Sequence, residues 1–200
     1  MKLLITTGAT VTFKKLISFT ITEFIQPCID LGFDEVYIQY GNEIDNGQHL
    51  SKEFINQCLE GVINYQLTSL EGEFLLERGG KSIKLIFFPF SNNLSKYIQA
   101  SDIIISHGGT GTIIDILKYS KPLLVVYNEE LMGNHQKEIA EEFTNLNYCI
   151  NVSSENLDEE QITSKVKKLI TNEVKLSEYE SNSGKVIQGI IYHEINRVKS

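Results

Sequence analysis

One stretch of the chain, residues 106–112, combines glycines with hydroxyl side chains between two apolar segments. Glycine has no Cβ atom, so its main-chain amide can come within hydrogen-bonding distance of a phosphate. Hydroxyl groups add further donors for the same kind of ligand. The residues of these two types are Ser106, Gly108, Gly109, Thr110, Gly111 and Thr112. Their spacing indicates a site for a phosphate-bearing ligand.

This glycine turn lies between a strand and a helix. Asp102 to Ile105 form the end of an apolar run typical of a buried strand, and the apolar residues after the turn follow helical spacing. A helix that begins near Gly109 or Thr110 has free main-chain amides and a partial positive charge at its start, which favour an anion. Asp115, one turn further on, could reach a sugar hydroxyl.

The turn matches neither common nucleotide fingerprint, since Gly-x-Gly-x-x-Gly spacing and a closing Gly-Lys-Ser/Thr are both missing. A purely structural interpretation therefore stays open, in which the glycines make a tight turn and bind nothing. Because open α/β sheets bind ligands beyond the carboxyl ends of their strands, we favour the ligand-binding interpretation.

The elements around the turn predict an α/β fold with a Rossmann-like, doubly wound and mostly parallel sheet. Residues 2–7 form a strand that ends in Thr7-Gly8-Ala9-Thr10, and a helix follows to a cap at Gly32, with Pro27 opening a separate last turn. Residues 35–41 form the next strand. The polar loops at 8–10, 41–42, 106–112 and 128–136 all follow strands, so we expect them to share one crevice.

The domain organisation predicted is one nucleotide-sugar-binding unit over residues 1–172 and a tail over 173–200. Residues 42–82 interrupt the alternation of strands and helices, and we expect an insertion with a short helix and a hairpin turning at 78–81. The tail has an apolar stripe typical of an amphipathic helix, which packs on the core or docks on a partner.

The composition limits the function classes. A net charge of -8 and a pI near 5.1 argue against nucleic acid as a partner. Three scattered cysteines indicate neither a disulfide framework nor a zinc site. No signal peptide or membrane span is apparent, so we expect a cytosolic chain. Since no Asp-x-Asp pair occurs, a metal-dependent sugar transferase is disfavoured and no cofactor is expected.

Two motifs resemble the donor-binding half of the GT-B glycosyltransferases of family 28. They are the stretch from Ile104 to Asp115 and the later Asn134-His135-Gln136 followed by Ile139-Ala140. The opening Thr6-Thr7-Gly8-Ala9-Thr10 and residues 37–41 narrow the resemblance to fungal cytosolic subunits of dolichol-linked UDP-N-acetylglucosamine transferases. The resemblance covers residues 2 to about 150.

The resemblance implies roles for individual residues. Residues 108–112 would receive the UDP diphosphate, Asp115 the ribose, and the loop Asn134-His135-Gln136 the sugar and diphosphate. The uracil would lie near residues 88–90, and Gly8 and Thr10 would add to the donor site. The family commonly has Glu at the position of Asp115, so the ribose contact is less secure than the glycine turn.

The resemblance further implies a heteromeric enzyme of which this chain is one half. It would transfer N-acetylglucosamine (GlcNAc) from UDP-GlcNAc, with inversion, to GlcNAc-diphosphodolichol. A membrane-anchored partner would supply the acceptor half and recruit the chain to the cytosolic face of the endoplasmic reticulum. For the general base, His107 and His135 are the candidates in this chain, but His107 beside a helix start suits a donor role better, and the partner is preferred.

Two other function classes remain open from the sequence. The first is a non-enzymatic UDP-sugar-binding module that regulates a partner, and the second is a dinucleotide-binding oxidoreductase, which would lack the usual first-turn glycine fingerprint. We expect Gly109→Val to abolish sugar transfer while leaving the fold intact.

Overall fold

The computed structural model describes residues 1–128 and 135–179. Its main sheet has the strand order β5-β6-β2-β1-β7-β8-β9, and every neighbouring pair is parallel except β5 and β6. The strands are β1 (Lys2–Thr6), β2 (Glu35–Gln39), β5 (Gly72–Arg78), β6 (Lys81–Phe88), β7 (Ile103–His107), β8 (Leu123–Tyr127) and β9 (Ile150–Ser153). This confirms the expected doubly wound, mostly parallel α/β sheet.

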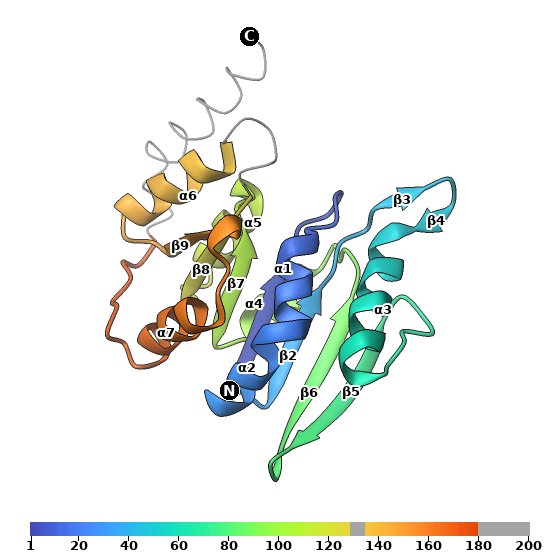
Figure 1. Cartoon of the computed structure of the whole chain (residues 1–200). Helices are drawn as coiled ribbons and strands as arrows, with labels where there is room; N and C mark the ends of the chain where they lie inside the picture. The colour runs from blue at the N-terminus through green and yellow to red at the C-terminus, as the bar shows by residue number, and fades with distance from the viewer. Residues whose placement is uncertain (129–134, 180–200) are drawn as a thin grey trace.

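Helices cover both faces of the sheet (Figure 1). They are α1 (Lys14–Phe19), the π-helical η1 (Thr20–Phe24), α2 (Ile25–Asp30), α3 (Leu50–Ile63), α4 (Leu94–Ala100), α5 (Thr110–Leu117), α6 (His135–Asn145), the 3-10 turn η3 (Ser154–Asn156) and α7 (Glu159–Ile170). A cluster of buried apolar residues lies between the sheet and each helical layer. The first cluster packs the sheet against α1, η1, α2, α3 and α7, and the second packs it against α4, α5 and α6.

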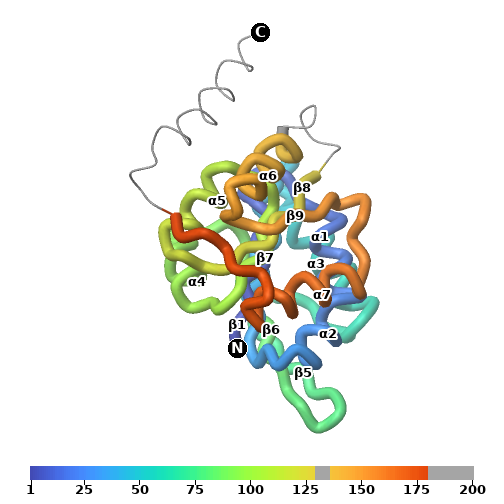
Figure 2. The backbone as a smooth tube through the Cα atoms, turned by 90° about the vertical axis from the view of Figure 1, so that its left-hand side faces the viewer, coloured from blue at the N-terminus to red at the C-terminus, as the bar shows by residue number. Residues whose placement is uncertain are grey.

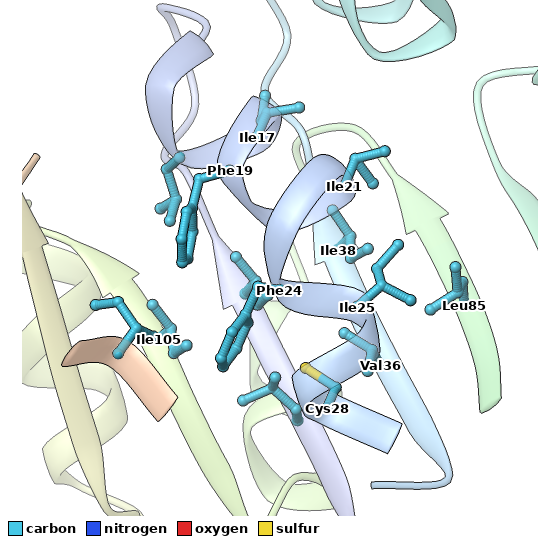
Figure 3. Packing of buried hydrophobic residues seen from close by; sticks show 14 of the residues in the cluster. Ile17, Phe19, Ile21, Phe24, Ile25, Cys28, Val36, Ile38, Leu85 and Ile105 are labelled. Atoms are coloured by element: carbon cyan, nitrogen blue, oxygen red, sulfur yellow. The ribbon is translucent and has the colours of Figure 1, made fainter. Parts of the chain in front are cut away.

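The alternation of side chains along the strands explains both layers. In β1, Leu3 and Ile5 belong to the first cluster, whereas Leu4 between them belongs to the second. Figure 3 shows Phe24 and Cys28 of the helical layer packed toward the strands of the first cluster. Strands that are apolar on both faces are typical of parallel sheets buried between helices.

The strand order places a topological switch point between β1 and β7. The chain moves from β1 outward to β2 and β6, and then returns to β7 on the other side of β1 before moving out to β8 and β9. The loops that follow β1 and β7 therefore diverge to opposite faces at the carboxyl edge, which is where open α/β sheets bind their ligands. The glycine turn and the residue 8–10 loop both lie at this point.

The segment 42–82 differs in part from the expectation. The hairpin of β5 and β6 forms as predicted, with Gly79 and Gly80 at φ 57° and 74°. However, α3 is 14 residues long rather than short, and it connects β2 to the β5–β6 pair. A second hairpin, β3 (Ile44–Asp45) with β4 (Gln48–His49), was not predicted, although its Asn46-Gly47 turn is a strong hairpin signal.

The first helical segment runs from Lys14 to Asp30 through the π-helical turn η1, so Pro27 does not open a separate turn. The π turn ends at Phe24, three residues before Pro27, whose nitrogen cannot donate a helical hydrogen bond. Gly32 follows at φ 86°, which agrees with its predicted role at the end of the helix.

The chain after α7 crosses from one helical layer to the other (Figure 2). Leu176 packs against the first cluster and Tyr179 against the second, where its ring lies 5.8 Å from that of Tyr148. Residues 180–200, with the apolar stripe of the predicted tail helix, lie outside the described residues. Across the described ranges, no helix combines the length and apolar content that crossing a membrane requires.

Candidate functional site

The glycine turn joins β7 to α5 as the sequence predicted. Strand β7 ends at His107, and α5 begins at Thr110 with Gly109 as its N-cap residue. Gly109 has φ -79° and ψ 118°, and it provides no side-chain cap for the helix. The start of α5 therefore presents main-chain amides and the positive end of the helix dipole at the carboxyl edge of the sheet.

The three glycines of the turn differ in what a side chain would meet. A Cβ atom on Gly108 would lie 2.9 Å from the Cβ atom of Gln136, and one on Gly109 would lie 2.3 Å from Nε2 of His107. A Cβ atom on Gly111 would meet no described atom within 4 Å. Packing inside the protein thus explains Gly108 and Gly109, whereas Gly111 faces open space, where a ligand can approach its backbone.

This geometry corrects the expectation for Gly109→Val. A valine side chain at Gly109 would overlap the His107 ring, because even the first carbon atom lies 2.3 Å from Nε2. That substitution must move the ring or the backbone, so it cannot test ligand binding in an unchanged fold.

His107 fills the space between the two loops of the switch point. Its Nε2 atom would lie 2.8 Å from a Cβ atom on Gly8, which comes from the β1–α1 loop and has φ 89°. Burial lowers the pKa of His107 to about 4, and a main-chain hydrogen bond at Thr6 acts in the opposite direction. The neutral ring agrees with the expectation, but burial is the main cause that the structure gives, whereas the sequence argument invoked the helix start.

A pKa of about 4 makes His107 a poor general base. A base accepts a proton most effectively when its pKa lies near the working pH, and His107 lies well below it. The neutral imidazole can instead donate one hydrogen bond. In this structure that bond is made at the main chain of Thr6, so a hydrogen-bond donor role of His107 toward a ligand stays a prediction.

Other predicted site residues lie at the same edge in different settings. The Ser106 hydroxyl is buried and donates to the main-chain carbonyl of His107 at 3.0 Å, so it points inward in this structure. Thr10 is exposed in the β1–α1 loop. Gln136 lies against the turn at Gly108, and its Oε1 atom accepts from the Asn128 amide at 3.1 Å. Asn134 and the side chain of His135 lie outside the described part of the chain.

A cavity of about 530 Å³ adjoins the glycine turn between α4 and α5. Its lining includes Phe90, Ser91, Gly111, Thr112, Asp115 and Lys118. The Phe90 side chain is 45% exposed, whereas Phe88 is buried and stacks on Tyr97 with 4.0 Å between ring centroids. Of the aromatic residues at 88–90, only Phe90 is therefore placed to face a ligand in this cavity.

Asp115 forms an ion pair with Lys118, whose Nζ atom lies 2.8 Å from Oδ1. Both side chains are more than half exposed, so the pair adds little stability. It still orients the carboxylate at the cavity. Lys118 was not predicted as a cavity residue, although the spacing of three residues along a helix signals such a pair. Within the described residues, no group of His, Cys, Asp and Glu side chains could hold a metal ion.

Comparison with known proteins places this geometry in a family. Residues 3–191 match the family described as "Glycosyltransferase family 28 C-terminal domain". The UDP-N-acetylglucosamine transferase subunit ALG13 of Candida albicans is 37% identical over 98% of this chain and 74% of its own length. The protein of the same name from Debaryomyces hansenii is 37% identical over 96% of this chain and 97% of its own length.

Solved structures agree with the sequence relatives. The NMR solution structure of an ALG13 protein superposes with a TM-score of 0.65 at 28% identity, covering 92% of both chains. MurG of Acinetobacter baumannii superposes with a TM-score of 0.53 at 13% identity over 86% of this chain and 42% of its own, a likeness of fold alone. The family match over nearly the whole chain leads to one conclusion: this chain belongs to glycosyltransferase family 28, as a form of its C-terminal domain.

Proposed function

We propose that this chain is the donor-binding catalytic subunit of a heteromeric inverting glycosyltransferase. The complex transfers GlcNAc from UDP-GlcNAc to GlcNAc-diphosphodolichol and so makes N,N'-diacetylchitobiosyl-diphosphodolichol, the second step of lipid-linked oligosaccharide synthesis for protein N-glycosylation. The observation that carries the proposal is the glycine turn at the switch point, where Gly111 leaves the start of α5 open beside a cavity. The names of the relatives agree with it.

The site suits a UDP-sugar in this reaction. The diphosphate binds at the start of α5, where main-chain amides and the helix dipole stabilise negative charge on the departing UDP. The uridine occupies the adjoining cavity, with Asp115 at the ribose and Phe90 at the base. This arrangement stabilises the leaving group through fixed dipoles and needs no metal ion at the diphosphate.

The acceptor half comes from a partner, and so does the general base. His107, with its pKa of about 4, does not deprotonate the acceptor hydroxyl. The partner that we propose is the membrane-anchored subunit of the family, asparagine-linked glycosylation protein fourteen. It brings this chain to the cytosolic face of the endoplasmic reticulum and presents the lipid-linked acceptor.

The test is to substitute Gly111 with alanine. The new methyl group meets no described atom within 4 Å, so it blocks only the approach of a ligand to the backbone. Gly61→Ala is the matched control, because Gly61 also lies inside a helix, α3, with nothing within 4 Å of its added methyl group. Both changes should raise the free energy of unfolding by up to about 1 kcal/mol, since alanine favours a helix over glycine.

The expected result is a loss of donor binding in the first variant alone. Titration with UDP-GlcNAc, in the presence of a chelator, should give a dissociation constant at least about tenfold higher for Gly111→Ala, a loss of about 1.4 kcal/mol. Gly61→Ala should bind as the wild type does. Equal binding by all three proteins would contradict the placement of the diphosphate. Tight binding without sugar transfer, with the acceptor half present, would instead favour the regulatory module.

A further inference from the structure

The carboxylate of Glu43 fastens the loop between β1 and α1. Its Oε2 atom accepts a hydrogen bond from the main-chain amide of Thr12 at 3.0 Å. Hydrogen bonds from Thr12 also hold the pKa of Glu43 below its usual value, so the side chain is a carboxylate at neutral pH. Glu43 follows β2, the strand next to β1, and thus joins two neighbouring connections at the carboxyl edge.

A buried serine completes this attachment. The Ser51 hydroxyl lies 2.7 Å from the Thr12 hydroxyl and accepts from the main-chain amide of Glu43 at 2.8 Å. Thr12 and Ser51 are both buried. The Asn42 amide also donates to the carbonyl of Ala9 at 3.0 Å. The loop is therefore held at Ala9 and again at Thr12 from the β2 side.

The opposite side of the same loop lies against the end of β7, next to the glycine turn. Gly8 packs against the His107 ring, and Thr10, between the two points of attachment, is exposed. In Figure 1 the β1–α1 loop, in dark blue, rises at the same edge as the connection from β2 to β3. The contacts from Glu43 thus act on a loop whose other face meets the glycine turn of β7.

We infer that Glu43 is a positioning residue for donor binding, which holds the β1–α1 loop in the shape that presents its backbone to the diphosphate. The inference rests on the proposed function for the identity of the ligand. A loop that is already ordered loses little conformational freedom when a ligand binds, and this favours affinity. The Glu43 side chain acts through Thr12 and does not touch the donor.

The charge and the hydrogen bond of Glu43 should have opposite effects on donor affinity. A carboxylate close to a diphosphate repels it, so only the hydrogen bond to Thr12 favours donor binding. Glu43→Gln keeps an oxygen that can accept from the Thr12 amide and removes the negative charge, whereas Glu43→Ala removes both. Donor affinity should therefore be kept or improved in the glutamine variant and lost in the alanine variant.

A matched control lies at the other end of β1. Asp102 accepts a hydrogen bond from the main-chain amide of Lys2 at 2.7 Å, so one carboxylate there joins the residue before β7 to the start of β1. It lies at the amino edge of the sheet, away from the crevice. Asp102→Ala should lower stability as Glu43→Ala does, because each removes one such bond, but it should leave donor affinity unchanged.

The experiment measures donor affinity and loop order on the full chain. In titrations with UDP-GlcNAc, we expect the dissociation constant to rise about tenfold for Glu43→Ala and to stay within about twofold of the wild type for Glu43→Gln and Asp102→Ala. Hydrogen exchange of the amides at residues 8–12, without ligand, should accelerate in Glu43→Ala alone. Unchanged affinity in Glu43→Ala, or an equal loss in Asp102→Ala, would overturn the inference.

The two readouts separate this inference from the proposed function. If the wild-type chain, tested with its acceptor half, bound no UDP-GlcNAc, the proposed function would fail. Hydrogen exchange would then still decide whether Glu43 orders the loop: acceleration at residues 8–12 would support the attachment, and unchanged exchange would overturn it. Loss of transfer in Glu43→Gln with donor affinity kept would overturn the positioning role in favour of proton transfer by Glu43.

Discussion

At the scale of single residues, His107 connects the two loops of the switch point through one ring. The ring occupies space that side chains at Gly8 and Gly109 would otherwise fill. Because that space is buried, the charged form of the ring is unfavourable and the pKa falls to about 4 from the usual 6.5. The burial that packs the His107 ring between the two loops is therefore also what keeps the ring neutral.

The shifted pKa predicts a pH dependence of stability. Below pH 6.5 the unfolded chain binds a proton at His107 that the folded chain takes up only near pH 4. The free energy of unfolding should therefore fall by up to about 3 kcal/mol between these pH values, at about 1.4 kcal/mol per pKa unit. Above pH 6.5 His107 should contribute no pH dependence.

Urea denaturation at several pH values checks this. In His107→Gln the side chain at position 107 does not titrate, whereas every other titrating group is kept. The difference in pH dependence between the variant and the wild type therefore measures the contribution of the His107 imidazole alone. Parallel stability curves for the two proteins from pH 7 to 4 would show that the folded protein accepts the proton freely.

The glycines show what residue types alone could predict. The sequence placed a ligand-accessible turn at residues 108–112, and the structure places that turn at the switch point. The sequence could not distinguish the three glycines from one another. At Gly108 and Gly109 a side chain would clash with Gln136 and His107, whereas Gly111 faces open space. Those requirements come from side chains that only the folded chain brings near, so spacing along the sequence carries no sign of them.

At the scale of elements, the strands with long apolar runs were the most predictable. Their side chains are buried on both faces, so composition alone marks them. The β3–β4 hairpin was missed because its strands have two residues each, too few for an alternating pattern. The attachment of the β1–α1 loop by Glu43 was missed as well, since it joins residues from two separate connections.

The turn residue Asn147 forms hydrogen bonds with the segment after α7, and this gives a prediction. Asn147 has φ 59°, and its side-chain amide donates to the carbonyl of Lys175 at 2.9 Å. Asn147→Gly should cost about 1 kcal/mol for the lost side-chain hydrogen bonds to Lys175 and Ser177, and Asn147→Ala about 2 kcal/mol because alanine also resists positive φ. Urea denaturation measures both values.

The same two substitutions at Asn172 calibrate the effect of positive φ, since that residue has φ 55°. The difference between alanine and glycine should be similar at the two sites. An equal cost of the two substitutions at Asn147 would mean that its backbone relaxes out of the left-handed conformation.

At the scale of the whole molecule, the proposed function makes donor binding depend on both halves of the sheet. Strand β1 leads into one half and β7 into the other, and their loops meet at the His107 ring. In the proposed function, an acidic chain with net charge -8 holds a diphosphate chiefly through main-chain amides and a helix dipole.

This arrangement predicts that UDP stabilises the whole fold without metal. At a UDP concentration 100 times the dissociation constant, the free energy of unfolding should rise by about 2.7 kcal/mol, which raises the melting temperature by about 5–10 °C for a domain of this size. Calorimetry with and without a chelator should give the same shift. A shift that the chelator abolishes would require a metal ion in the donor site.

The exposed ring of Phe90 has a practical consequence. The chain contains no tryptophan, so an indole placed at this position would be its sole source of tryptophan fluorescence. The ring is 45% exposed and lines the cavity proposed for the uracil, where a stacked base would quench the emission. In Phe90→Trp, the decrease in tryptophan fluorescence should therefore report nucleotide binding in real time, without an attached dye.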